Sequence, residues 1–232
     1  MTIFNLTLAQ LRTDLKTRLD EVSADGLWAT SELNTQLNRA YLRVQMDTEQ
    51  YTRTATINLL ANLGWYSLPT DCLVPKYLYG PTAWNFERIY PTTLAVLDRA
   101  DRGLGSWEKD TPGISLLFIP FSWDKFILWP APSSTTTISL FYAAIPIDLS
   151  ADSDTTVLDP QAQKLLPIYA AYLALRKDRF DKAVPFLQEY RQRLGIVKSE
   201  LANHASYKPT QMRPAGWFDR AQKGDPTFRL RP

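Results

Sequence analysis

Side chains that could do acid–base, nucleophilic or metal chemistry are scarce in this sequence. It holds one histidine, His204, and one cysteine, Cys72. One histidine and one cysteine are too few for a metal site with two histidines or several cysteines. A Ser-His-Asp triad would have to use His204. The sequence also lacks a P-loop, a dinucleotide-binding glycine fingerprint and a Gly-x-Ser-x-Gly motif. We therefore interpret His204 as a surface residue or as the partner of a helix C-terminus.

Carboxylates are more numerous, and two groups of them are candidate sites. One group falls in a single polar loop and suggests calcium, but it lacks the glycine and terminal glutamate of an EF-hand; its members are Asp148, Asp152, Asp154 and Asp159. The other could flank a cleft for glycosidic hydrolysis, although the sequence does not fix the separations involved; its members are Asp98, Asp101, Glu108 and Asp110. Loops rich in Ser, Thr and Asp are usually solvated. We therefore predict no metal, no cofactor and no enzymatic activity.

Basic residues gather near the end of the folded part. They are Arg176, Lys177, Arg179, Lys182, Arg191, Arg193 and Lys198. The simpler interpretation is a solvated helix face, because Glu189 and Glu200 are interspersed with them. The alternative function is a nucleic-acid-binding module that uses this helix pair and the C-terminal residues, although neither helix-turn-helix spacing nor a homeodomain-type arm accompanies them.

The last 28 residues, Ala205 to Pro232, differ from the rest of the sequence. They contain four prolines, two glycines and almost no periodic apolar pattern, yet they include Trp217, Phe218 and Phe228. Six basic residues against two acidic ones give them a net charge of +4. Such a segment is typical of an extended arm that orders against a partner, with aromatic and arginine side chains as anchors. The predicted partner-binding residues are Arg213, Trp217, Phe218, Arg220, Phe228, Arg229 and Arg231.

The overall composition predicts that most of the chain folds. Of its 232 residues, 45% are hydrophobic and 22% charged, which suffices for one large core or two small ones. The net charge of +2 leaves −2 for the residues before the arm, so bulk affinity for nucleic acid is not expected. The single cysteine excludes an internal disulfide and fits a reducing cytoplasm. No run approaches the roughly 18 apolar residues of a membrane span, so no membrane partner is expected.

Apolar spacing predicts a pair of helices at the start of the chain. The first is predicted to follow Thr7, which forms a capping-box pattern with Gln10, and its apolar positions are Leu8, Leu11, Leu15 and Leu19. An Asp25-Gly26 break precedes the second, for which Thr30 or Ser31 is the predicted N-cap. The apolar face of this second helix comprises Leu33, Leu37, Ala40, Tyr41 and Val44. Two short amphipathic helices joined by a tight break are typical of an α-hairpin.

The middle of the sequence favours short antiparallel strands. Polar or proline breaks separate predicted strands at about 52–59, 65–68, 85–90, 114–119, 126–129 and 136–142. Prolines at the strand ends suit antiparallel strands rather than a buried parallel sheet. Pro69 is predicted to close the second strand and Asp71 to begin a turn, whereas residues 92–102 suit a short helix or a strand equally. Five of the seven tryptophans lie in this region, which is more aromatic surface than a small sheet hides.

Helical spacing returns after the acidic loop. Asp159-Pro160 predicts an N-cap and a first helical residue, and an apolar stripe then runs from Leu165 to Leu175. Asp181 is the predicted cap of a further helix, with Pro185 near its first turn. The predicted fold class is therefore α+β, a helical bundle of two α-hairpins with an inserted antiparallel β-rich domain and an extended C-terminal arm. The predicted boundaries are 1–50 for the N-terminal α-hairpin, 51–150 for the β-rich insertion, 151–204 for the C-terminal α-hairpin and 205–232 for the arm.

Several short motifs occur in a familiar order along this framework. They are Trp28–Leu33, Leu37–Tyr41, Gly64–Asp71, Ile127–Pro132, Leu140–Tyr142, the acidic loop, Pro167–Tyr172 and Tyr190-Arg191. In this order the chain resembles the head-to-tail adaptor, or connector, proteins of tailed bacteriophages, in particular the short-tailed type. The similarity extends from about Leu6 to Leu201. The motifs are short, and their order and spacing within a helix–sheet–helix framework carry the resemblance.

The resemblance implies a structural virion protein made in the host bacterial cytoplasm. Such adaptors form a ring of identical subunits, here expected to be a dodecamer, between the portal protein of the DNA-filled head and the tail nozzle, with fibres or spikes as further partners. The ring surrounds a channel through which genomic DNA passes without sequence-specific contact. The resemblance implies no catalytic residue. It also implies that the C-terminal segment reaches along the portal, although no motif of this arm matches the family residue by residue.

Overall fold

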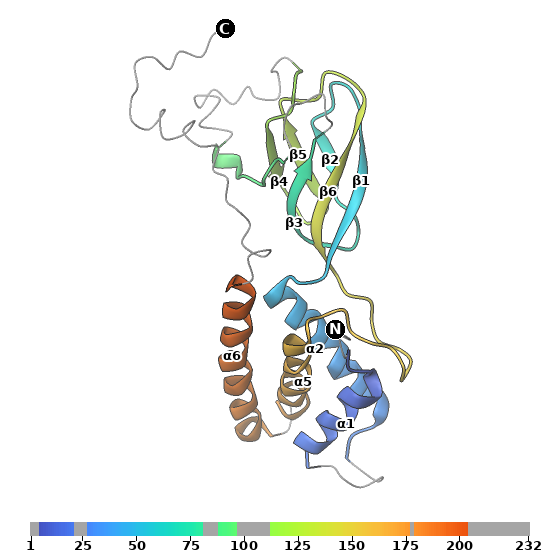
Figure 1. The fold of residues 1–232 in the computed structure, drawn as a ribbon, viewed down its shortest axis with the longest axis vertical. Helices are drawn as coiled ribbons and strands as arrows, with labels where there is room; N and C mark the ends of the chain where they lie inside the picture. Colours follow the sequence, from blue (N-terminus) through green and yellow to red (C-terminus); the bar gives the residue numbers. More distant parts are fainter. Residues whose placement is uncertain (1–4, 21–26, 81–87, 97–111, 177–178, 204–232) are drawn as a thin grey trace, which may run out of the picture. The chain divides into compact units, whose positions relative to one another are not determined.

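Helices occupy both ends of the folded chain and strands its middle (Figure 1). The computed structural model describes residues 5–20, 27–80, 88–96, 112–176 and 179–203. The chain divides into two compact units, Met1–Tyr190 and Arg191–Pro232, and the contacts below lie within the first. The mixture of helices with small antiparallel sheets confirms the α+β class. The elements are α1 (Leu8–Arg18), α2 (Thr30–Thr48), β1 (Thr52–Leu59), β2 (Trp65–Ser67), β3 (Cys72–Tyr79), β4 (Leu117–Pro120), β5 (Lys125–Trp129), β6 (Thr136–Ala144), α4 (Pro160–Gln163), α5 (Leu165–Leu175) and α6 (Phe180–Asn203).

Helix α1 begins at the predicted capping box. The backbone N–H of Gln10 donates to Thr7 Oγ1, and the backbone N–H of Thr7 donates to Gln10 Oε1 at 2.9 Å. The helix ends because Leu19 leaves the helical conformation as the C-cap and Asp20 turns into the left-handed region with φ 59°. The apolar face is buried at Leu8, Leu11 and Leu15.

The N-cap of helix α2 lies one residue before the first of the two predicted caps. Its N-cap is Ala29, so Thr30 and Ser31 lie inside the helix. Because Ala29 has no capping side chain, Glu32 supplies the reciprocal half of the box and accepts a hydrogen bond from the Ala29 N–H. Glu49 ends the helix with φ 50°. The predicted apolar face is buried in full, comprising Leu33, Leu37, Ala40, Tyr41 and Val44.

The C-terminal helices differ from the prediction at their ends. Asp159 caps α4 by accepting from the Gln161 N–H, and Pro160 is its first residue, as predicted. The helix then breaks at Lys164, and α5 starts separately at Leu165. Asp181 is not the cap of α6, because that helix begins at Phe180 and Asp181 lies in its first turn. An acidic side chain there still faces the positive end of the helix dipole.

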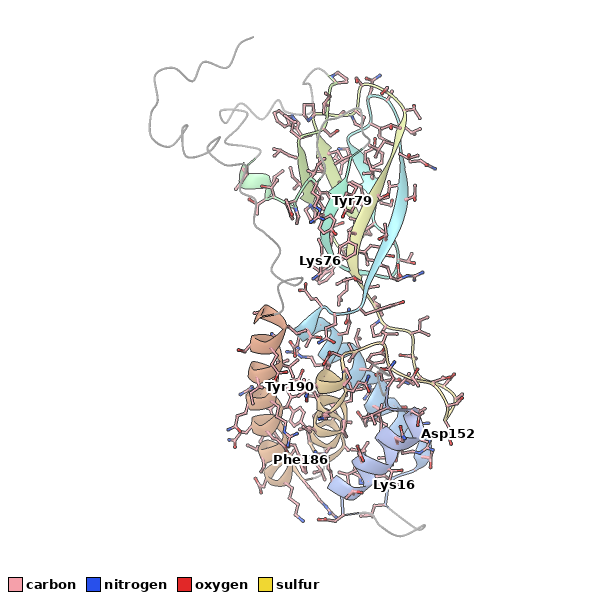
Figure 2. All side chains as sticks on the ribbon, viewed as in Figure 1. Lys16, Lys76, Tyr79, Asp152, Phe186 and Tyr190 are labelled. Atoms are coloured by element: carbon pink, nitrogen blue, oxygen red, sulfur yellow. The ribbon has the colours of Figure 1, made fainter. Side chains whose placement is uncertain are left out.

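Helix α5 lies at the centre of the helical packing. It contacts both α1 and α2, and it is apolar nearly all round, as expected of a helix covered on most sides. The first part of α6 is attached through Tyr190, which is buried (Figure 2). The Tyr190 hydroxyl donates to Asp47 Oδ2 on α2 at 2.7 Å, and its ring lies 4.7 Å from that of Tyr169 on α5. One tyrosine therefore ties α6 to two other helices.

The strands form two antiparallel three-stranded sheets that share one core. Their orders are β1-β6-β3 and β2-β5-β4. In the first sheet β1 pairs with β6 from Thr52 opposite Ala143 to Leu59 opposite Thr136. The inward-facing side chains of both sheets pack together, and the fully buried rings of Phe118 and Phe126 lie among them, 5.2 Å apart and edge to face. Each sheet therefore buries one of its faces against the other sheet.

Five of the six predicted strands are present, and one strand was not predicted. The strand expected at 114–119 begins only at Leu117, and the part of 85–90 that the structure describes contributes a single bridge, between Ile89 and Leu78. Residues 94–96 are helical. The unpredicted strand is β3, which contains Pro75. Proline is tolerated because β3 is an edge strand whose register shifts on either side of Pro75.

The two sheets join the helices at one buried side chain. Gln45 near the end of α2 is fully buried, and its Nε2 donates to the carbonyl oxygens of Tyr51 and Ala144 at 2.9 and 3.0 Å. Its Oε1 accepts from the Tyr51 N–H at 3.0 Å. Tyr51 immediately precedes β1 and Ala144 ends β6. A single amide therefore satisfies backbone groups on the strand that leaves the helices and on the strand that returns.

Replacement of Gln45 by leucine is expected to lower the free energy of unfolding by about 2–3 kcal/mol, because buried backbone groups lose their partners. Urea titration of the full chain measures this loss. The matched control on the same helix is Gln36→Leu, since Gln36 Oε1 is buried without a hydrogen-bond partner among the described residues. The control should be neutral or slightly stabilising. Equal stability of the two variants would contradict the role assigned to Gln45.

Candidate functional site

Most of the sequence-predicted candidates lie outside the described residues. This applies to all seven partner-binding residues of the arm, Arg213, Trp217, Phe218, Arg220, Phe228, Arg229 and Arg231, and equally to His204, Asp98, Asp101, Glu108 and Asp110. Those predictions remain predictions. The described candidates are the acidic loop and most of the basic helix residues.

Three of the four carboxylates in the acidic loop stabilise the fold. Asp154 Oδ2 accepts from the backbone N–H groups of Ser150 and Ala151, both at 2.8 Å. Asp152 Oδ1 forms an ion pair with Arg12 at 2.9 Å, and Asp159 caps α4. Across the described ranges, no group of three or more His, Cys, Asp or Glu side chains is placed to hold a metal ion. The loop is therefore held together by backbone donors and by contact with α1.

The basic residues are exposed wherever the structure describes them. Arg176, Arg179 and Lys182 are accessible around the start of α6, and Arg191, Arg193 and Lys198 are accessible farther along it. These basic residues are exposed and lie among acidic residues. They are therefore more typical of a solvated helix face than of a phosphate-binding groove.

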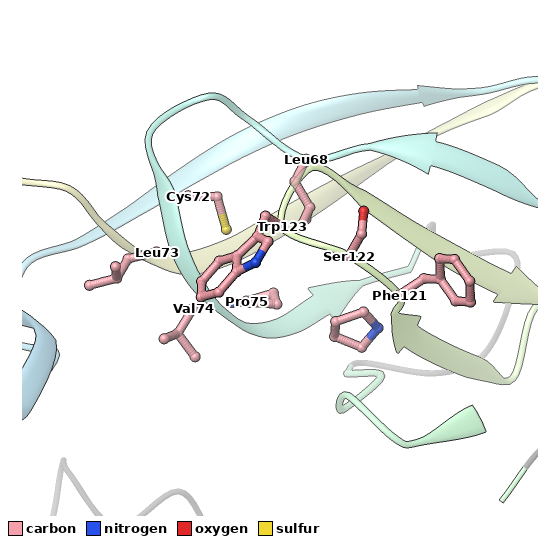
Figure 3. A pocket seen from close by; sticks show the side chains of 9 residues that line it. Leu68, Cys72, Leu73, Val74, Pro75, Phe121, Ser122 and Trp123 are labelled. Carbon is pink, nitrogen blue, oxygen red and sulfur yellow. The ribbon is translucent and has the colours of Figure 1, made fainter. Parts of the chain in front are cut away.

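An apolar groove lies where the edge strands of the two sheets meet (Figure 3). It is lined by Leu68 beyond β2, by Cys72–Pro75 at the start of β3, and by Pro120–Trp123 at the end of β4 and in the turn to β5. Its volume is about 360 Å³, near the lower end of the range for binding pockets. Apart from Ser122 and the Cys72 thiol, the lining is apolar or aromatic. The groove therefore suits an apolar side chain rather than a charged substrate.

The β4–β5 turn presents two aromatic side chains beside this groove. Trp123 is 88% exposed and Phe121 is 52% exposed. The turn is held by hydrogen bonds from the N–H groups of Phe121 and Ser122 to the Lys125 carbonyl, at 3.0 and 3.1 Å. The Phe121 ring also packs edge to face on Trp65 at 5.0 Å. A tryptophan so exposed on a well-held turn is typical of an interaction site.

The groove offers no obvious chemistry beyond binding. Burial, together with the charge of Asp71, raises the pKa of the Cys72 thiol to about 11, so the thiol is protonated at neutral pH and is a poor nucleophile. The sequence did not reveal this site, because the residues between the strands predicted at 114–119 and 126–129 were interpreted as a break and β3 was not predicted. The only signal was the excess of tryptophan in the middle of the chain.

Comparison with known proteins identifies the family. A family model described as SU10 adaptor protein matches residues 6–216. The chain belongs to this family. No curated protein matches it significantly. The predicted resemblance to phage adaptors is therefore confirmed.

As a member of a phage adaptor family, the chain has a structural role in the virion. The match begins at residue 6, just before α1, and ends within the arm, so it includes both sheets and the described helices. Within the described helices of this adaptor, no stretch is both long enough and apolar enough to cross a bilayer.

Replacement of Asp154 by asparagine tests whether this carboxylate stabilises the adaptor. Hydrogen bonds from the Ala151 and Ser150 N–H groups lower the pKa of Asp154 in the folded state. Because the pKa of Asp154 is lower in the folded state, its ionised carboxylate stabilises the fold at pH values above the pKa of the unfolded state, near 3.9. This stabilisation is lost as the pH falls through the pKa of the folded state. The variant should therefore be less stable than the parent at pH 7, and the difference should vanish toward pH 2.

Urea midpoints at several pH values measure this difference. Asp148→Asn is the control, because Asp148 is exposed and makes no hydrogen bond or ion pair with the described residues. A stability difference between the parent and Asp154→Asn that stays constant down to pH 2 would show that the ionised carboxylate is not the cause.

Proposed function

We propose that this chain is a head-to-tail adaptor whose copies form a ring, of twelve subunits, between the portal protein and the tail nozzle. The ring completes the DNA-filled head and surrounds the channel through which the genome leaves. The observation that carries this proposal is the family match over residues 6–216. Ring number, position between portal and nozzle, and the attachment of fibres or spikes go beyond that match and belong to the proposal.

The proposal divides the work among four segments. Residues 1–50 and 151–204 form the helical bundle as two α-hairpins, residues 51–150 form the inserted β-rich domain, and residues 205–232 form the arm. The Gln45 junction supports an insertion of this kind, because β1 departs from and β6 returns to the same point on α2. An inserted domain attached at the end of α2 can present a surface without disturbing the helices.

The charge distribution suits a channel that must release its cargo. The residues before the arm carry a net charge of −2 and the arm carries +4. Tight binding to the DNA backbone requires several phosphate contacts from Lys or Arg. A body without excess positive charge lets DNA pass without sequence-specific contact, and it directs the basic arm toward a protein partner.

The arm is proposed to bind a protein, either the portal or a neighbouring subunit. Trp217, Phe218 and Phe228 would fill apolar pockets on that partner, because buried aromatic side chains dominate the affinity of protein interfaces. Four arginines, Arg213, Arg220, Arg229 and Arg231, would pair with carboxylates and set the orientation of the arm.

Replacement of both Trp217 and Phe218 by alanine in the phage is expected to leave DNA-filled heads that lack tails. Loss of one aromatic anchor costs about 2 kcal/mol, or roughly 30-fold in affinity. Electron micrographs of lysates, scored for tailless filled heads, give the measurement. Truncation after His204 should act in the same way and leave a folded body.

Gln222→Ala is the control within the arm, since it removes neither an aromatic ring nor a charge. Normal numbers of tailed, infectious particles from the double variant would contradict the arm's role. The nucleic-acid alternative predicts instead that the isolated chain binds DNA with a steep dependence on salt concentration.

A further inference from the structure

We propose that the apolar groove between β3 and β4 receives the C-terminal arm of a second copy of this chain. The inference rests on the proposed ring, and it deepens it by assigning the arm an acceptor on the neighbouring subunit. Trp123 and Phe121 are the aromatic contacts of the acceptor, and Trp217 and Phe218 are those of the arm.

The groove lies along the part of the edge strands β3 and β4 that the segment around residues 89–92 does not cover. Toward the end of β3, Leu78 exchanges two backbone hydrogen bonds with Ile89, both at 2.8 Å. On β4, the Phe118 carbonyl accepts from the Thr92 N–H at 2.8 Å. The segment around residues 89–92 thus lies along both edge strands. Within the described residues it leaves the start of β3 and the end of β4 open, and there the groove lies.

The open edge favours binding through side chains rather than through added strand pairing. Pro75 has no N–H to donate, and the register shifts on both sides of it interrupt the regular spacing that a new strand would need. An incoming segment therefore gains little from backbone hydrogen bonds. Recognition falls to the apolar and aromatic lining.

The arm has the composition that such a lining binds. Grooves formed by aromatic and proline side chains accept extended proline-rich segments, whose ordering cost is small. The arm places Trp217 and Phe218 between Pro214 and Pro226. On the acceptor, the hydrogen-bonded β4–β5 turn holds its rings in place before binding, which lowers the ordering cost on that side as well.

Charge makes a smaller, favourable contribution. Asp124 is exposed beside Trp123, and a hydrogen bond from the Ser122 hydroxyl lowers the pKa of its carboxyl group. It is therefore ionised at neutral pH and attracts an arm of charge +4. Lys125 follows directly and offsets part of this attraction. Apolar contact should therefore dominate, and added salt should weaken binding only slightly.

The arm is long enough to reach another subunit. Trp217 follows the end of α6 at Asn203 by 14 residues. At about 3.3 Å per residue this segment spans up to roughly 45 Å. An arm that bound its own chain would add nothing to assembly, whereas an arm that binds the next copy links each subunit to its neighbour and gives the head-to-tail contact that a ring requires.

A labelled peptide of residues 205–232 tests the inference when it is titrated with the full chain. The chain carries Trp217→Ala and Phe218→Ala, so that its own arm does not compete. Fluorescence anisotropy should show saturable binding, and adding Trp123→Ala should weaken it at least tenfold. Because Trp123 is exposed, its removal does not threaten the fold. Ile147→Ala, which is 78% exposed and outside the groove, is the matched control and should leave the affinity unchanged.

Alkylation of Cys72 locates the bound peptide independently. Cys72 is the only cysteine and lines the groove, so an occupant should slow its reaction with iodoacetamide. Because the raised pKa of the thiol makes this reaction slow at neutral pH, the rates with and without peptide are compared at mildly alkaline pH. The pairing in trans is tested by mixing two full-length variants, one with Trp123→Ala and the other with Trp217→Ala and Phe218→Ala. These should form 1:1 complexes by sedimentation velocity, because only one groove and one arm remain.

Equal peptide affinity with and without Trp123, an unchanged alkylation rate, or two variants that stay separate on mixing would each overturn the inference. The results of these experiments distinguish failure of the groove–arm interaction from failure of the proposed function. Failure of peptide binding together with tailless heads from arm variants would retain the adaptor and direct the arm to the portal. Peptide binding to the groove together with normal particles from arm variants would instead refute the arm's role in head completion.

Discussion

The buried amide of Gln45 connects the strands of this protein to its helices. The chain passes from α2 into β1 and returns to the helices after β6, and both crossings carry backbone groups that cannot be left without partners away from water. Gln45 offers one NH₂ group with two donors and one carbonyl acceptor. It uses all three toward Tyr51 and Ala144. An apolar residue at this position would remove this partner from the Tyr51 N–H and the Ala144 carbonyl, and only the hydrogen bond from the Ala144 N–H to the Tyr51 carbonyl would still join the two crossings.

The same helix fastens the chain that returns from the sheets. Asn38 accepts from the Leu149 N–H and donates to the Leu149 carbonyl, and the Tyr41 hydroxyl accepts from the Val157 N–H. The returning loop also reaches α1, where the carbonyl of Asp154 accepts from the Leu8 N–H at 2.8 Å. The acidic residues that suggested a cation site thus belong to a loop whose backbone joins two helices, and the charge of Asp154 orders that loop.

The sequence allowed the helices to be predicted better than the strand pairing. The face from Leu33 to Val44 follows from local spacing, and the Thr7 box follows from contacts three residues apart. Strand pairing depends on distant residues: β1 pairs with β6 and not with β2, which follows it directly. The strand β3 was missed because Pro75 argues against a strand unless its edge position is known. The groove could not be predicted for the same reason, since it exists only where β3 and β4 come together.

Pro75 links the solubility of this β region to its capacity for binding. An exposed edge strand can pair with any similar strand, and proteins prevent this with prolines and bulges. Both devices occur at the start of β3. They also remove the regular side-chain ladder and open the space that Trp123 flanks. In the proposed interaction, these features disfavour unspecific strand pairing and favour the binding of aromatic side chains. The proposed ring would require this combination, because each subunit would have to remain separate after synthesis and still recognise an identical neighbour during assembly.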